Sequence, residues 1–296
     1  MKIASALVLS AAAGFFGSAV ASAADMEPPV EPGLVPAGLI DGYVGYRSTT
    51  STDYVHTDGL TYGGAARFSL PLFDIFSIQG DAQGEWYDDI DDSWEPTEAW
   101  ALGGHISVRD PELGLIGAFA AYSNGDGVDE HNGPPTHSLV VGGEFQYYLD
   151  DLTLYVQAGY ADIIYDSGEP EGFVDGWFVR GVGRYFLGDD TRLQAEISYG
   201  ETSQFVDAED DGEITNWEVE LRTGFGFDMP LYGFIGYRGG YYDATTEEDD
   251  GEEHVGFVGL SFLFGADSLR HNDRYGATLD LPMLPARAAP WAEGLD

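Results

Sequence analysis

Alternation of apolar and polar residues is the sequence feature that most constrains how this chain can fold. In the stretch FSIQGDAQGEW (76–86), Phe76, Ile78 and Trp86 share one set of alternate positions with glycine and alanine. The other set is polar: Ser77, Gln79, Asp81, Gln83 and Glu85. A period of two predicts a β-strand with two unlike faces. The apolar face would be the core of a soluble barrel, or would meet lipid in a membrane barrel.

Stretches of this kind recur along most of the chain. We predict strands at roughly 38–48, 58–70, 74–87, 97–109, 112–122, 137–149, 152–164, 175–187, 191–201, 214–227, 231–242 and 253–265. Short turns alternate with long connections at 49–57, 88–96, 123–136, 165–174, 202–213 and 243–252. Tight turns at one end and long loops at the other are the layout of membrane barrels, although a soluble up-and-down barrel also accommodates this spacing.

The N-terminus predicts export. Residues 1–23 begin with Lys2, continue with a mostly apolar run, and end in the small-residue cleavage site Ala21-Ser22-Ala23. We interpret them as a secretory signal peptide. The chain contains no cysteine, which excludes disulfide bonds and Cys-ligated metal sites.

The charge of the chain is strongly negative. Lys2 is the only lysine, so removal of the signal leaves 11 Arg against 52 acidic residues, or 11 − 52 = −41. This charge argues against a nucleic-acid partner, because phosphate binding needs a basic surface. Glycine (41 residues) and aromatic residues (14 %) are too frequent for a disordered acidic chain, and favour an all-β protein.

Aromatic residues are placed at the ends of the predicted strands. Trp86, Trp100, Trp177 and Trp217 all lie next to long loops. The turn-side ends carry further aromatic residues, among them Phe225, Phe262 and Phe264. Two aromatic belts are typical of strands that cross from one membrane–water interface to the other.

The polar faces of the predicted strands carry charges of both signs. By alternation, the predicted lumen-lining residues are Arg67, Gln79, Asp81, Gln83, Glu85, Arg109, Glu144, Arg180, Arg184, Glu196, Glu218, Glu220 and Arg222. Arginines and carboxylates on facing walls can pair across a lumen, although a solvent-exposed sheet face could also hold them.

The final predicted strand contains GLSFLFG, with Phe262 and Phe264 following Gly259. This resembles the insertion signal in the last strand of Gram-negative outer-membrane barrels. With the belts and the turn pattern, residues 38–265 resemble the porin-like family of these proteins. The resemblance implies a transmembrane antiparallel up-and-down β-barrel of about 12 strands in the bacterial outer membrane. It also implies contacts with outer-membrane lipid, lipopolysaccharide and the barrel-assembly machinery.

Two segments flank this predicted barrel. Residues 24–37 are Pro-rich and cannot form a β-ladder. Residues 266–296 are expected to form a C-terminal tail at the periplasmic end, because the last strand ends on the short-turn side. The tail is either a flexible segment or a plug that folds back into the lumen, and its composition favours disorder.

The expected function is a channel for passive diffusion of ions or small solutes, without a cofactor and without enzymatic activity. The six long loops contain many acidic residues and no Lys or Arg, so the entrance should concentrate cations. The alternative is a non-conducting barrel that acts as a surface scaffold or adhesin through these acidic loops.

Two further patterns have a weaker chemical interpretation. DAEDDGEITNWE (207–218) places Asp207, Glu209 and Asp211 at the spacing of a calcium-binding loop, although coincidence in an acidic loop explains it better. His105 and Ser107 form a His-x-Ser pair, as in outer-membrane acyl hydrolases, with Glu98 and Glu112 as possible third members. We expect no catalysis from them, because both would face the lumen, away from outer-leaflet lipid.

Overall fold

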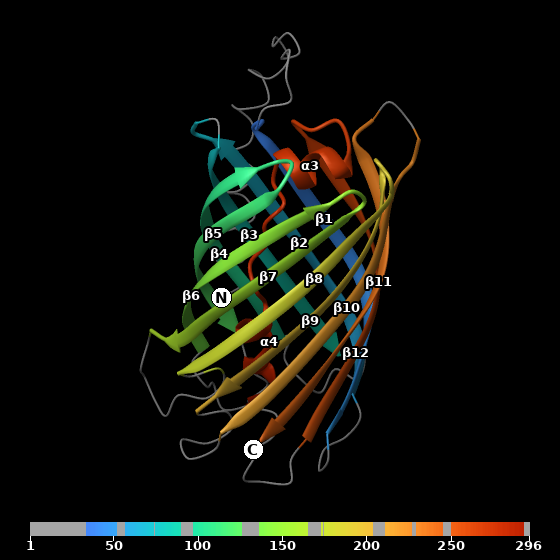
Figure 1. Cartoon of the computed structure of the whole chain (residues 1–296). Coiled ribbons are helices and arrows are strands. Elements are labelled where there is room, and N and C mark those ends of the chain that lie inside the picture. Colours follow the sequence, from blue (N-terminus) through green and yellow to red (C-terminus); the bar gives the residue numbers. More distant parts are fainter. Residues whose placement is uncertain are drawn as a thin grey trace, which may run out of the picture.

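The computed structural model describes residues 34–51, 57–73, 75–89, 97–125, 136–164, 173, 175–203, 211–226, 229–244 and 250–292. Its strands are β1 (Ala37–Ser51), β2 (Thr57–Pro71), β3 (Phe76–Asp89), β4 (Thr97–Asp110), β5 (Gly114–Gly125), β6 (Thr136–Leu149), β7 (Leu152–Ile163), β8 (Gly176–Gly188), β9 (Thr191–Thr202), β10 (Gly212–Gly224), β11 (Leu231–Ala244) and β12 (Asp250–Phe264). They form one closed antiparallel barrel, which confirms the predicted fold of 12 strands (Figure 1).

Pairing of the first and last strands closes the barrel. The ladder between β1 and β12 runs from Gly38 opposite Phe264 to Ser51 opposite Gly251. Each strand of the barrel therefore has a hydrogen-bonded neighbour on both sides. Closure matters because an unpaired strand edge would leave backbone groups unsatisfied in hydrocarbon.

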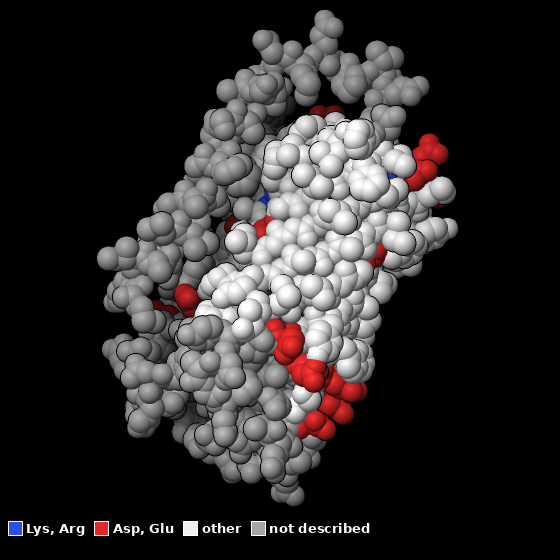
Figure 2. All heavy atoms as spheres, turned by 90° about the vertical axis from the view of Figure 1, so that its left-hand side faces the viewer, with Lys and Arg blue, Asp and Glu red and all other residues white. Residues whose placement is uncertain are grey.

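The apolar faces of the strands point outward. Ile78, Val219 and Leu221 are 37 %, 47 % and 39 % exposed, whereas Asp81 and Glu220 are each 5 % exposed. On the side shown in Figure 2, a broad and largely uncharged surface separates acidic side chains near the two ends. The alternation of the sequence is therefore that of a membrane barrel, with lipid outside and polar groups inside.

Aromatic rings contact one another across strands near both ends of the barrel. Trp86 stacks on Tyr62 at the loop end, and Trp177 lies against Tyr199. The other predicted belt residues also take part: Trp100 packs against Tyr122, Trp217 against His254, and Phe264 against Phe68 and Phe262, while Phe225 is exposed at the turn end.

The C-terminal tail enters the barrel. After β12, Gly265 has a positive φ of 76°, and a Cβ at this position would lie 2.0 Å from the carbonyl oxygen of Pro36. Glycine thus permits the sharp turn that leads into α3 (Leu269–Tyr275) at the turn end of the barrel. An extended segment then leads to α4 (Leu284–Ala292), which lies toward the loop end (Figure 1).

The tail packs inside the wall at both ends. Leu269 of α3 joins a buried cluster with Leu39, Phe186, Tyr232 and Leu263. Near the loop end, Leu284 of α4 is buried in a second cluster, whose wall members include Phe119, Phe178, Ile214 and Tyr242. The hydrophobic contacts at these two places hold the tail in position along the lumen.

The sequence predicts that the tail at 266–296 lies at the periplasmic end, as a flexible segment or as a plug that folds back into the lumen. In its described part α3 lies at the turn end, and residues 276–286 are buried inside the barrel, as in the plug alternative. A barrel of this width leaves space that wall side chains do not fill, and the tail occupies part of it. The predicted signal peptide and most of the Pro-rich segment lie outside the described residues. Neither helix of the described tail is long and apolar enough to cross a bilayer.

Introducing a charge on the lipid-facing side should destabilise the barrel. We expect Val219→Arg to lower the free energy of unfolding by about 2–4 kcal/mol, the cost of arginine near the bilayer midplane. Urea unfolding in phospholipid vesicles measures this, with Val219→Leu as the apolar control. An unchanged unfolding midpoint for Val219→Arg would contradict the outward orientation.

Candidate functional site

The candidate functional site is the lumen, where the wall binds the extended tail segment at 276–283. Side chains of the wall donate hydrogen bonds to the main-chain carbonyls of this segment. The Arg109 guanidinium donates to the carbonyl oxygen of Gly276 at 2.7 Å. The Arg184 guanidinium donates to that of Thr278 at 2.9 Å. The wall therefore recognises the tail partly through groups that every peptide has.

Two glutamines of β3 continue this pattern. The Gln79 side-chain amide donates to the carbonyl oxygen of Leu279 at 2.7 Å and accepts from the Leu279 N–H at 3.3 Å. Gln83 donates to the carbonyl oxygen of Leu281 at 2.7 Å. Gln79 thus pairs with both polar groups of Leu279, as a neighbouring strand would.

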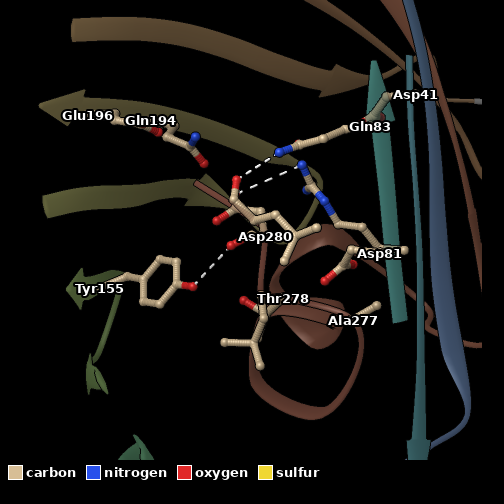
Figure 3. A network of polar contacts seen from close by, with 12 residues as sticks. Asp41, Asp81, Gln83, Tyr155, Gln194, Glu196, Ala277, Thr278 and Asp280 are labelled. Atoms are coloured by element: carbon tan, nitrogen blue, oxygen red, sulfur yellow. Dashed lines mark hydrogen bonds and ion pairs between the residues drawn. The ribbon is translucent and has the colours of Figure 1, made fainter. Parts of the chain in front are cut away.

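Asp280 is the centre of the polar contacts between tail and wall. Its carboxylate lies 2.6 Å from a nitrogen of Arg180, 3.4 Å from Arg184 and 3.9 Å from Arg67. Its carbonyl oxygen accepts from Gln157 at 2.9 Å, and the Tyr155 hydroxyl, which Figure 3 shows directed at Asp280, lies 3.4 Å from the same oxygen. Burial favours the neutral acid, but the three guanidiniums outweigh burial and hold the pKa of Asp280 below its ordinary value.

Asp273 of α3 is a second buried carboxylate of the tail. It accepts from the Thr153 hydroxyl at 2.5 Å, from Arg184 at 3.0 Å and from the Thr278 hydroxyl at 2.9 Å. Burial opposes its ionisation, but Arg184 and the two hydroxyls lower the pKa of Asp273 from its ordinary value. Arg184 therefore joins both tail carboxylates to the same strand, β8.

Arg287 makes the corresponding contact from α4. Its guanidinium lies 2.5 Å from a carboxylate oxygen of Glu85, which also pairs with Arg238 at 2.7 Å. The Tyr87 hydroxyl donates to the same carboxylate at 2.7 Å. Ion pairs of both polarities thus join the tail to the wall. Acidic residues of the tail pair with arginines of the wall, and Arg287 of the tail pairs with an acidic residue of the wall.

A histidine between two carboxylates supports this wall. His105 Nε2 lies 2.6 Å from Asp81, and its Nδ1 lies 2.9 Å from Glu144, with all three side chains buried. Two carboxylates on opposite sides of the ring favour the charged imidazolium over the neutral imidazole. Glu144 also accepts from Tyr155 at 2.7 Å and from Gln157 at 3.2 Å, the two residues beside the Asp280 carbonyl.

The tail leaves part of the lumen unfilled. A cavity of about 110 Å³ remains beside residues 280–287 of the tail. Its lining contains six arginines and six acids: Arg67, Arg180, Arg192, Arg222, Arg238 and Arg287, with Asp41, Glu85, Glu196, Glu218, Glu220 and Asp280. The formal charge of this lining is therefore balanced.

The structure places the predicted lumen-lining residues on the inner side of the wall. Nine are buried: Gln79, Asp81, Glu85, Arg109, Glu144, Arg180, Arg184, Glu220 and Arg222. The other four, Arg67, Gln83, Glu196 and Glu218, line the cavity. The sequence analysis missed Arg192 and Asp41, although each continues the alternation of its strand. It also missed Asp273 and Asp280, whose segment has no strand periodicity.

The two other sequence patterns gain no support from the described residues. Ser107 hydrogen-bonds to Ser77 at 2.8 Å rather than to His105, and Glu98 accepts from Trp86 at 3.0 Å, so no catalytic triad is assembled there. Of the predicted calcium ligands, Asp207 and Glu209 lie outside the described residues, and Asp211 is exposed. The part of the chain that the structure describes contains no cluster able to hold a metal ion.

Comparisons with known proteins support the fold. No family model and no curated protein matches the sequence. The structure is similar to an outer-membrane channel from Pseudomonas putida F1, with a TM-score of 0.55 and 13 % identity over 81 % of this chain and 100 % of that one. The translocator domain of the autotransporter NalP from Neisseria meningitidis gives 0.48 and 12 %, covering 87 % and 97 %. The KdgM porin gives 0.44 and 10 %, covering 74 % and 98 %.

The likeness to the Pseudomonas channel supports the fold of a closed antiparallel β-barrel, and the apolar outer surface is that of a barrel in a membrane.

Removing the buried histidine should destabilise the wall. His105→Leu leaves Asp81 and Glu144 without the cation between them, and we expect a loss of about 3–5 kcal/mol of unfolding free energy. Ser107→Ala, two residues along the same face, should cost only about 1 kcal/mol, the value of one neutral hydrogen bond. Urea unfolding of both variants compares them. Equal losses would contradict a charged role for His105.

Acid should weaken the binding of the tail. Because the pKa values of Asp273 and Asp280 are lowered in the docked tail, their pairing stabilises docking fully above the ordinary aspartate pKa of 3.8. That stabilisation is lost progressively as the pH falls below this value. Amide hydrogen exchange of residues 276–283, corrected for the intrinsic pH dependence, should accelerate below about pH 4. Unchanged protection down to pH 2 would contradict this assignment.

Proposed function

We propose that this protein is an outer-membrane channel that its own C-terminal tail closes, and that it conducts ions or small solutes when the tail leaves the lumen. The extended segment contacts the wall through hydrogen bonds and ion pairs and through the buried side chains of Leu279, Leu281 and Met283. Water can replace the polar contacts when the segment leaves. The apolar contacts of this segment and of the two tail helices would oppose release and favour the closed state.

The observation that carries the proposal is the charged cavity beside the tail. A lumen that served only stability would gain as much from well-packed apolar residues, because buried ion pairs often contribute no net stability. This lumen instead holds six arginines and six acids around residual space. Facing charges of opposite sign are what lines the constriction of a water-filled pore.

The equal numbers of arginines and acidic residues in the cavity lining also affect the expected selectivity between cations and anions. Because the charges of its lining cancel, we assign the predicted cation preference to the acidic long loops at the entrance. Charges that are exposed to solvent are screened by salt far more than buried charges are. The preference should therefore be moderate and should depend on ionic strength.

The filled lumen favours one alternative function. A barrel that the tail closes permanently would act as a surface scaffold or adhesin through its acidic loops. Such a protein would not conduct under any condition that leaves the barrel folded. Conductance measurements therefore separate the two functions.

Weakening the tail should open the channel. We expect Asp280→Asn to raise the open fraction in planar bilayers about 10- to 100-fold, because a charge-assisted contact is worth about 1.5–3 kcal/mol. Asp267→Asn is the matched control, since the Asp267 carboxylate is 98 % exposed in the same tail. If neither variant conducts while both remain folded, the channel function is wrong.

The open channel should prefer cations. Under a salt gradient, the reversal potential of the Asp280→Asn chain should have the sign of cation flow. The preference should be larger near 0.1 M salt, where the Debye length is about 10 Å, than at 1 M, where it is about 3 Å. A preference for anions at low salt would contradict the role assigned to the acidic loops.

A further inference from the structure

We propose that the lumen is a binding site for extended acidic peptides supplied from outside the chain, with the tail as its internal occupant. The proposal rests on the proposed function only in requiring that the tail can leave. It extends that function by naming the class of molecule that the emptied lumen would take. The tail segment 276–283, GATLDLPM, shows what such a ligand looks like when bound.

The wall binds the main-chain groups of successive tail residues. The carbonyl oxygens of Gly276, Thr278, Leu279, Asp280 and Leu281 each accept a hydrogen bond from a wall side chain. Gln79 binds both the N–H and the carbonyl of Leu279. Main-chain hydrogen bonds of this kind give affinity for an extended peptide without regard to its sequence.

The wall also selects the side chains at two positions of the bound segment. The Asp280 carboxylate has Arg180 and Arg184 within 3.4 Å, and Arg67 beyond them at 3.9 Å. The preceding Leu279 packs in a buried cluster with Leu115, Tyr155 and Val182 of the wall. The preferred ligand is therefore an extended peptide in which a leucine-like residue precedes an acid.

The binding groups of this site belong to the wall rather than to the tail. Its donors lie on β3, β4, β7 and β8, and these strands pair with their neighbours and not with the tail. When the tail leaves, Arg180, Gln79 and Gln157 lose partners that a peptide of the same chemistry would restore. A tethered tail competes at an effective concentration of about millimolar, so a free peptide binds measurably only when the tail is weakened.

The test uses the full-length Asp280→Asn chain in detergent and a fluorescein-labelled GATLDLPM peptide. We expect fluorescence anisotropy to show binding at least about tenfold tighter than that of the matched peptide GATLNLPM, which lacks the charge. The wild-type chain should bind the acidic peptide at least about tenfold more weakly than the variant does, because its own tail competes. Adding Arg180→Gln to the variant should remove most of the preference for the acidic peptide.

Absence of binding to the Asp280→Asn chain, or equal binding of the two peptides, would overturn the proposal. Asp273→Asn is a second variant with a weakened tail, and it replaces the first if Asp280→Asn fails to fold; the same criteria apply to it. Bilayer conductance separates this proposal from the channel. A chain that conducts but does not bind the peptide is a channel without a peptide site, and one that binds but never conducts has the peptide site without the channel.

Discussion

The rest of the structure depends on the need to satisfy every backbone hydrogen bond within hydrocarbon. Pairing of β1 with β12 meets that need by closing the sheet. Once the sheet is closed in lipid, strand alternation sends apolar residues outward and charged residues inward. Val219 and Glu220, adjacent in sequence, therefore lie in lipid and in the lumen, respectively. Because the apolar residues of each strand face lipid, the alternate polar and charged residues face the lumen.

The buried charged side chains of the lumen need oppositely charged partners, and the wall provides only some of these partners. Arg222 pairs with Asp41 and Glu220 within the wall. Arg180 pairs with Glu196 of the wall and with Asp280 of the tail, whereas both carboxylates that pair with Arg184, Asp273 and Asp280, belong to the tail. The tail is thus electrostatically complementary to the strands that it covers. This explains why a Pro- and Arg-containing segment is ordered in the lumen. It also explains why loss of a single tail carboxylate should weaken the binding of the whole extended segment to the wall.

The sequence predicts the barrel well because alternation is local. Each strand shows its two faces within ten residues, so the lumen-lining set from Arg67 to Arg222 can be assigned without knowledge of strand partners. The tail could not be predicted in this way. Gln79 and Leu279 are 200 positions apart, and no periodicity in 276–283 points to the wall. The Asp81–His105–Glu144 cluster was missed for the same reason, because the three residues lie on three different strands.

The path of the tail has a consequence for the topology of the whole chain. Twelve strands, an even number, return the polypeptide to the side of the membrane on which β1 began. The tail then runs back inside the barrel from α3, at the turn end, to α4, toward the loop end (Figure 1). Pro36 and Leu284 consequently lie toward opposite faces of the bilayer. The even strand count alone would leave the residues after β12 at the end of the barrel where β1 begins, and the described tail instead extends toward the other end.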